Sequence, residues 1–318
     1  MPGESQYRAE NYAGAYFPQA PLSDHDASGH LTSPLYGYLP TAWVNDLFLT
    51  LFVISTVLHF AQTIRSRAWW LLPTVVLAGS GEIIGWVGRT LSHYKPLDHN
   101  AYIIQTVTLI ISPTPLIGAL FITFGRMTSH LGHQYSRVSP RLCEYFRCDF
   151  VALLVQCGGG GIAASSSTPD GSKLGSNIML GGIIFQLVSL SVFCVLMIEY
   201  LYRRLQDKPL KPSIVYTAEP TDSYSSVREG GPIPRSLMHL AIALCVESAC
   251  LYIRAIYRTV ELADGWNGQV IQTQYLFVIF DGLMVFTTMA LMNVFHPGRL
   301  SKPEIMSGAL PLTSKVSV

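Results

Sequence analysis

The sequence predicts an all-α polytopic membrane protein, a bundle of seven transmembrane helices with the N-terminus outside the cell and the C-terminus in the cytosol. Composition gives the first reason, because 49% of the 318 residues are hydrophobic and only 13% are charged, against about a quarter charged in soluble domains. Segment length gives the second, because seven apolar stretches approach the roughly 20 residues that a helix needs to cross a bilayer. The distribution of Lys and Arg gives the orientation.

The seven apolar segments lie near residues 42–62, 69–87, 101–124, 150–166, 177–201, 236–256 and 275–295. The fourth is the weakest, because it is short and contains four consecutive glycines at 158–161. Together the segments form a membrane domain over residues 41–298. We expect residues 1–40 to be an extracellular polar tail, the cytosolic loop 203–234 to be disordered because it is rich in Ser, Thr, Tyr, Pro and Glu, and residues 299–318 to be a short cytosolic tail.

Positive charge is distributed unevenly between the two sides of this predicted bundle. Fifteen of the 21 Lys and Arg residues fall in or beside the connections on one side, five fall on the other side, and Arg254 falls within a span. Lys and Arg accumulate in cytoplasmic loops, so the side with fifteen is predicted to be cytosolic.

Charged and amide side chains recur at helical spacing within the apolar segments. Residues seven apart on a helix lie about 20° apart around its axis, and such stripes should face the bundle interior because lipid cannot hydrogen-bond them. We predict a charged substrate-binding pocket toward the outer leaflet, formed by Glu82, Arg89, Gln105, Gln156, Gln186, Arg254, Arg258, Glu261 and Asp281. Asp149 falls at the inner edge of the fourth segment, and Glu247 extends the stripe of the sixth.

Two interpretations of these polar residues remain open. Intramembrane charge is costly and marks a functional site by default, and we expect Glu82 and Asp281 to be the partners of Arg254 and Arg258. Interhelical ion pairs and amide hydrogen bonds can also simply hold a bundle together, at about 0.6–2 kcal/mol each.

Other patterns narrow the function classes. A net charge of +1 gives no support for nucleic-acid binding. The glycine run is followed by no Gly-Lys-Ser/Thr, so it does not indicate nucleotide binding. Neither the histidines nor the pair Cys143 and Cys148 have the spacing of a metal site. We expect no cofactor, no metal and no enzymatic activity; the sequence leaves the oligomeric state open.

The polar residues, with several glycines and prolines, also resemble the motifs of a known family. The matching residues are Tyr38, Leu39, Pro40, Asn45, Glu82, Gly85, Gly88, Arg89, Ile104, Gln105, Pro113, Asp149, Gln156, Gly159, Gly160, Gln186, Phe193, Arg254, Arg258, Glu261, Gly265, Asp281, His296, Pro297 and Gly298. They occur in order along residues 38–298. The chain thereby resembles the fungal lipid-translocating exporters, the family named for resistance to 7-aminocholesterol.

The resemblance implies a plasma-membrane protein that moves or releases sphingoid long-chain bases and other amphiphiles, with membrane lipids and an amphiphilic small molecule as partners. Relatives are also tied to resistance to toxic lipophiles and to porphyrin handling. Where the family usually has an acid and then a tyrosine ahead of the aspartate, this chain has Gln274 and Val278. A neutral Gln274 alters the charge balance of the pocket and leaves the substrate open.

Three function hypotheses follow. The first is an exporter of amphiphiles in which Glu82 and Asp281 hold a cationic amine while Arg254 and Arg258 set the charge of these acids. The second is a seven-helix lipid sensor or receptor, which shares the predicted topology. The third, less favoured, is an intramembrane lipid hydrolase that uses residues such as His59.

Overall fold

The computed structural model describes residues 33, 36–132, 135–136, 142–166, 168–210, 233–265 and 268–298, and these residues form helices and connections with no strand. Six helical stretches are long and apolar enough to cross a membrane, and the fourth expected segment is a shorter apolar helix at Phe150–Ser165. The all-helical polytopic fold predicted from the sequence is confirmed, including the weakness of the fourth segment. The protein is an integral membrane protein.

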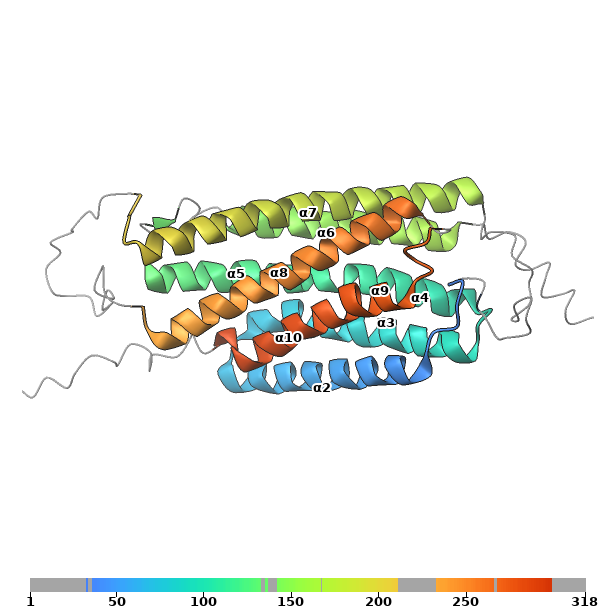
Figure 1. The fold of residues 1–318 in the computed structure, drawn as a ribbon, viewed down its shortest axis with the longest axis horizontal. Coiled ribbons are helices and arrows are strands. Elements are labelled where there is room, and N and C mark those ends of the chain that lie inside the picture. Colours follow the sequence, from blue (N-terminus) through green and yellow to red (C-terminus); the bar gives the residue numbers. More distant parts are fainter. Residues whose placement is uncertain are drawn as a thin grey trace, which may run out of the picture.

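The elements run roughly parallel or antiparallel along one long axis, with α8 crossing its neighbours obliquely (Figure 1). The helices and short helical segments are α2 (Ala42–Ser66), η1 (Trp69–Leu71), η2 (Leu72–Val76), α3 (Leu77–Tyr94), α4 (His99–Ile111), α5 (Pro113–Leu131), α6 (Leu142–Ser165), α7 (Pro169–Leu205), α8 (Arg235–Asp264), α9 (Gln274–Phe277), η4 (Val278–Leu283) and α10 (Met284–Val294).

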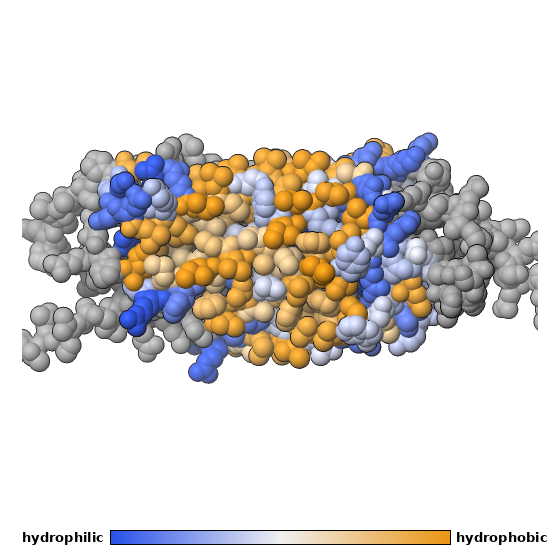
Figure 2. Space-filling view, viewed as in Figure 1, coloured by the Kyte–Doolittle hydropathy of each residue, from blue (hydrophilic) through white to orange (hydrophobic). Residues whose placement is uncertain are grey.

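Hydrophobic side chains cover the middle of the molecule and hydrophilic ones gather toward its two ends (Figure 2). Large apolar side chains such as Trp43, Val57 and Val195 are exposed on this surface, while Glu82, Arg89 and Asp281 are buried beneath it. This inverted distribution is what a bilayer requires, because lipid stabilises apolar groups and cannot satisfy polar ones.

Helices α3 and α4 are in direct contact because glycines line one face of α3. A Cβ atom on Gly81 would lie 2.6 Å from the Ser112 side chain, and one on Gly88 would lie 3.0 Å from the Ala101 carbonyl oxygen. Gly85 packs against the side chain of Leu109 in the same way. Small residues at this spacing let helices in lipid approach closely, so the face that carries Glu82 and Arg89 is held against α4.

The third membrane span is divided at Ser112, where α4 ends and α5 begins with Pro113. Ser112 keeps helical backbone angles, with φ −59° and ψ −34°, so the break lies in the hydrogen bonding rather than the path of the chain. Proline has no N–H and leaves the carbonyl four residues earlier without its helical donor. That carbonyl belongs to Leu109, and it needs a donor from elsewhere.

The glycine run in α6 contacts a neighbour through only half of its members. Gly159 lies against the backbone of α7, where a Cβ would be 2.8 Å from the Gly175 oxygen, and Gly160 faces Val107. Gly158 and Gly161 have no atom within 4 Å of a Cβ position and are exposed. Two of the four glycines therefore let α6 approach its neighbours closely, Gly159 toward α7 and Gly160 toward α4.

Helix α7 has 37 residues, which corresponds to about 55 Å against a hydrocarbon core of about 30 Å. The fifth span was expected to begin near residue 177, but the helix begins at Pro169 with Thr168 as its N-cap. Its first turns extend past the apolar belt and form one wall of the site below. At the same end of the bundle α8 ends after Asp264, across the cavity from α7. Gly265 adopts φ +79° there, a backbone angle that favours glycine.

The first and last described residues lie at opposite ends of the bundle (Figure 1). Which end faces the cytosol stays a prediction from the charge distribution. The predicted tails lie outside the described residues except for 33 and 36–40, as does most of the predicted loop, from 211 to 232.

Candidate functional site: a buried charge cluster beneath a polar cavity

Two arginines on α8 share one aspartate from the seventh span. Asp281 Oδ1 accepts hydrogen bonds from the Nε atoms of Arg254 and Arg258, each at 2.9 Å, and its Oδ2 accepts from Arg258 Nη2 at 2.5 Å. Arg258 Nη1 also donates to Glu261 Oε2 at 2.6 Å. Each of these four residues is less than 5% exposed. The predicted pairing of Asp281 with both arginines is confirmed.

Local helix geometry brings these groups together. The arginines and Glu261 are four and three residues apart on α8, so they project from one face. Asp281 lies in η4, a stretch of π-helix in which i→i+5 hydrogen bonding widens the turn; such bulges recur at functional sites. Gly282 next to it packs against Trp86, whose ring would lie 2.8 Å from a Cβ. The seventh span is thus pressed onto α3 while Asp281 faces α8.

The arginine cluster also reaches the break in the third span. Arg254 Nη2 donates to the Leu109 carbonyl oxygen at 2.6 Å, the acceptor that Pro113 leaves without its helical N–H. The Arg254 guanidinium therefore pairs with the Asp281 carboxylate of the seventh span and donates to the free Leu109 carbonyl of the third span. It links both spans to α8.

Glu82 differs from the sequence-based expectation. Ser112 Oγ donates to its Oε1 at 2.5 Å, and its Oε2 has no hydrogen-bond partner among the described residues. The expected pairing of Glu82 with Arg254 and Arg258 is therefore wrong; Glu82 is instead bonded to the residue that precedes Pro113. The reason is local, because the glycine face of α3 brings Ser112 directly over this carboxylate.

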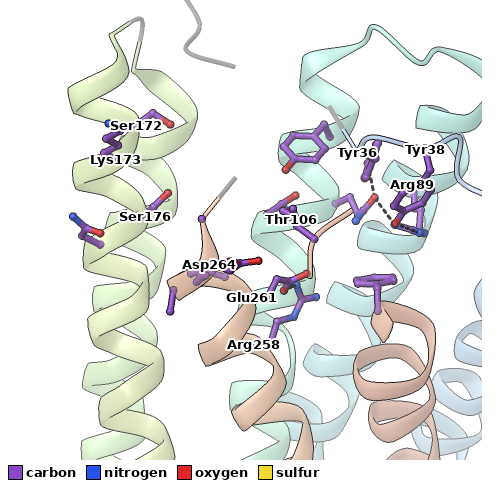
Figure 3. Close-up of a pocket in the computed structure, with 18 residues that line it drawn as sticks. Tyr36, Tyr38, Arg89, Thr106, Ser172, Lys173, Ser176, Arg258, Glu261 and Asp264 are labelled. Carbon is purple, nitrogen blue, oxygen red and sulfur yellow. Dashed lines mark hydrogen bonds and ion pairs between the residues drawn. The ribbon is translucent and has the colours of Figure 1, made fainter. Parts of the chain in front are cut away.

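A cavity of about 340 Å³ lies at the end of the bundle above this cluster, between α3, α4, α7, α8 and the segment before α2. Figure 3 shows Arg258 and Glu261 between a wall from α7, with Ser172, Lys173 and Ser176, and a wall formed by Tyr36, Tyr38 and Arg89. Of the predicted site residues, Arg89, Gln105, Arg258 and Glu261 border the cavity. Glu82, Arg254 and Asp281 do not border it and lie in the buried cluster.

The wall around Arg89 consists of neutral and aromatic groups. Arg89 donates to Asn45, Gln105 and Tyr38, at 3.2, 3.5 and 2.9 Å. Both this guanidinium and that of Arg258 lie over the ring of Phe277, with centroid distances of 4.3 and 5.3 Å. Aromatic faces attract such cations, so Phe277 stabilises both.

Tyr36 closes this wall from the N-terminal segment. Its hydroxyl donates to Gln105 Oε1 at 2.5 Å and lies 3.0 Å from Ser92 Oγ. Burial raises the pKa of this hydroxyl well above its usual range, so Tyr36 remains neutral and keeps its proton for Gln105. Thr41 Oγ1 donates to Gln274 Oε1 at 3.1 Å, which fastens the same segment to α9.

The acidic side of the cavity is the end of α8. Glu261 accepts from Tyr257 as well as from Arg258. Asp264 is exposed, borders the cavity and accepts from the Val270 backbone N–H at 3.2 Å, and it forms no ion pair with a basic side chain among the described residues. The free carbonyl groups of a helix C-terminus add partial negative charge here.

Two predicted amides form a separate cluster away from the cavity. Gln156 Nε2 donates to Gln186 Oε1 at 3.0 Å, and Thr114 Oγ1 contacts Gln156 Oε1 at 3.4 Å. This cluster joins α5, α6 and α7. Glu247 is also buried on α8, and the side chain of Asp149 lies outside the described residues.

Sequence reasoning missed four groups: Tyr36, Phe277, Ser112 and Asp264. The only one with a clear signal is Ser112, because Pro113 implies an unsatisfied carbonyl at Leu109 and a local need for donors. His59, which the hydrolase hypothesis named, has its Nε2 3.0 Å from the Met289 oxygen, and its ring centroid lies 6.4 Å from that of His296. In the described residues no three His, Cys, Asp or Glu side chains are grouped closely enough to hold a metal ion.

Comparison with known proteins decides the family. The family model described as "RTA1 like protein" matches residues 75–304, which include α3, α4, the arginines of α8 and Asp281. The chain belongs to the RTA1-like family. It is 26% identical over 324 residues to "Sphingoid long-chain base transporter RSB1" of Saccharomyces cerevisiae (strain YJM789), covering 96% of this chain and 82% of that protein.

A second relative is "Protein RTA1" of Saccharomyces cerevisiae (strain ATCC 204508 / S288c), 27% identical over 290 residues, with 83% of this chain and 84% of that protein covered. No solved structure matches the chain. The family resemblance predicted from the sequence is confirmed, and the relatives place the chain in a lipid-related transporter family.

Proposed function

We propose that this protein exports amphiphilic lipids of the sphingoid long-chain base type, or lipophilic toxic compounds of similar shape, across the plasma membrane, and that it thereby confers resistance. It does so without a cofactor and without chemical conversion of the substrate. The name of the RSB1 relative supports the substrate class. The observation that carries the proposal is the cavity, whose acidic side meets a small apolar cluster.

The cavity suits a polar head rather than a whole lipid. Its volume of about 340 Å³ is near the lower end of small-molecule sites. Glu261 and Asp264 supply negative charge for a protonated amine, and Gln105 and Thr106 supply hydrogen-bonding groups for hydroxyls. Exposed Lys173 and Asn177 also border the cavity, so its edge reaches the exterior of the bundle along α7.

An apolar path for the tail begins on the same elements. Ile110, Met179 and Ile183 form a buried cluster separate from the main core, and Leu262 packs against it. Leu262 also borders the cavity. A head group in the cavity would leave its alkyl chain over this cluster, between α4, α7 and α8, where the chain can extend toward lipid.

The contacts of the acids support an assignment of the amine that differs from the one expected from the sequence. Asp281 is saturated by two arginines and does not border the cavity, so we assign the amine to Asp264 and Glu261 instead of to Glu82 and Asp281. Asp264 is the better probe, because it has no ion pair to break. A charge-assisted hydrogen bond contributes about 1.5–3 kcal/mol, or roughly 10–150-fold in affinity.

The test is flux of labelled sphinganine in liposomes that contain the purified protein, together with release from loaded cells. We expect Asp264→Asn to reduce flux at least roughly tenfold. Asp170→Asn is the matched control, because Asp170 is exposed in the first turn of α7 and does not border the cavity. Equal flux in the wild type and Asp264→Asn would remove the assignment of the amine.

The same assay separates the alternatives. A lipid sensor would bind sphinganine and leave it in its original leaflet, so saturable binding without flux would favour the sensor. A hydrolase would release a cleaved product from an amide or ester lipid, so the recovered lipid is checked by mass spectrometry. Intact sphinganine on the far side of the membrane supports transport.

A further inference from the structure

Arg89 is a buried cation that forms no ion pair in the part of the chain that the structure describes. It has no exposed surface, and in the described part of the chain no carboxylate pairs with it. Arg254 and Arg258, at the same end of the bundle, both bond to Asp281. An unpaired ion removed from water is costly even after structural relaxation, so Arg89 differs from its neighbours in a way that calls for a negative partner.

The guanidinium is only partly satisfied by the neutral groups around it. Of its five N–H donors, three are used in hydrogen bonds to Asn45, Gln105 and Tyr38, and the bond to Gln105 is long at 3.5 Å. Phe277 covers one face. A guanidinium accepts a phosphate or carboxylate through two parallel N–H bonds, which are shorter and stronger than bonds to neutral oxygens.

Two of these neutral partners, Tyr38 and Gln105, border the cavity together with Arg89. Their oxygens accept from the two Nη atoms, where an anionic oxygen would bind. Tyr38 belongs to the segment before α2 and not to a membrane helix. Figure 3 shows Arg89 and the two tyrosines on the side of the cavity away from Lys173, with Glu261 between them. The cavity therefore offers a cation on one side and carboxylates nearby.

We propose that the cavity binds an amphiphile whose head carries an acidic group as well as an amine, a phosphate monoester of a long-chain amine being the simplest case. Arg89 binds the acid in place of Tyr38 and Gln105, while Glu261 and Asp264 bind the amine. This inference rests on the proposed function and specifies its substrate class. The opposite reading is that Arg89 only fastens residues 36–41 to α3, which predicts a stability effect and no preference for an acidic head.

The experiment compares sphinganine with sphinganine 1-phosphate, two ligands with the same tail, for binding to the full-length protein in nanodiscs of neutral lipid. We expect the phosphate form to bind roughly tenfold more tightly or better. In Arg89→Gln the ratio of the two dissociation constants should fall to about one, and Arg89→Lys should keep an intermediate ratio. Arg65→Gln is the matched control and should keep the wild-type ratio. Arg65 is exposed in the last turn of α2, at the end of that helix remote from the cavity.

Tyr38→Phe should change the preference for the phosphate form in the opposite direction to Arg89→Gln. It removes the hydroxyl that occupies Arg89 Nη2, so the preference for the phosphate form should rise above that of the wild type. A ratio equal to or below the wild-type value would contradict the displacement of Tyr38 and with it the proposal.

The remaining outcomes separate the two proposals. If wild-type protein binds or moves neither ligand, the proposed function fails. If it moves sphinganine but the phosphate adds no affinity, or if the preference survives Arg89→Gln, only the acidic subsite fails. Competition by inorganic phosphate without tighter binding of the phosphorylated amphiphile would assign Arg89 to a free anion and overturn the lipid head group.

Discussion

Two buried polar clusters in the same bundle are built in different ways. The charged cluster joins α8 to the seventh span through ion pairs of 2.5–2.9 Å, with Asp281 bonded to two arginines. Arg254 joins it to the third span through a hydrogen bond to the Leu109 carbonyl oxygen. The amide cluster joins α5, α6 and α7 through Gln156 and Gln186, and the Nε2 of Gln186 has no partner among the described residues. Only the charged cluster lies beneath the cavity.

The difference shows what charge demands in lipid. A neutral amide that lacks one hydrogen bond loses a modest free energy, about 0.6–2 kcal/mol, so a partly satisfied amide pair is tolerable as packing. In the charged cluster each arginine has a carboxylate partner, and Arg254 also bonds the Leu109 carbonyl, which ties three spans to one geometry. We therefore expect substitutions in the charged cluster to affect transport and stability together, and substitutions in the amide cluster to affect stability alone.

The largest effect is expected for Asp281→Leu. Among the described residues it leaves Arg254 with no ion pair and Arg258 with Glu261 alone, and breaking a buried pair costs about 3–5 kcal/mol. Thermal unfolding in detergent should shift strongly downward and sphinganine flux should be lost. The double variant Arg254→Met/Asp281→Leu should recover part of the stability, because one unpaired charge is gone; an additive loss in the double variant would mean that the two residues are not coupled.

An intermediate effect is expected for Pro113→Ala. The new N–H can bond the Leu109 carbonyl, which Arg254 Nη2 now satisfies at 2.6 Å. Stability should rise by about 1 kcal/mol, the net contribution of one hydrogen bond, while flux should fall if α4 and α5 must move relative to each other. Unchanged flux in a more stable protein would show that the break is a static feature and that only the ion pairs carry the coupling.

Most of the fold was predictable because lipid simplifies the pattern. An apolar span of sufficient length has few alternatives to a helix, so the order and type of the spans followed from hydropathy alone. Helix ends were less predictable: α7 starts at Pro169 rather than near 177, because its first turns lie beyond the apolar belt and contribute no hydropathy signal.

The site was predictable in its charges and less so in its contacts. Helical spacing placed Arg254, Arg258 and Glu261 on one face, and Asp281 was one of the two acids expected to pair with the arginines. Helical spacing could not show that Glu82 would bond to Ser112, because that contact depends on how closely the glycines of α3 let α4 approach. Nor could helical spacing show that two guanidiniums lie over the ring of Phe277, since the π-helical stretch beside it changes the register of the seventh span.

The smallest effect on transport is expected for Gln156→Leu, and it tests the neutral half of the comparison. The change removes the hydrogen bond to Gln186 and the contact with Thr114, which should lower the free energy of unfolding by about 0.6–2 kcal/mol. Flux should stay within about twofold of the wild type, a difference of about 0.4 kcal/mol in activation free energy. Gln105→Leu is the matched comparison, because Gln105 is also a buried amide but borders the cavity and bonds to Tyr36 and Arg89. We expect its flux to fall well below that of Gln156→Leu at similar stability, measured in the same liposomes with protein content checked. Equal losses of flux in the two variants would mean that the substrate path extends to the amide cluster, and that the cavity alone does not define where the protein handles its ligand.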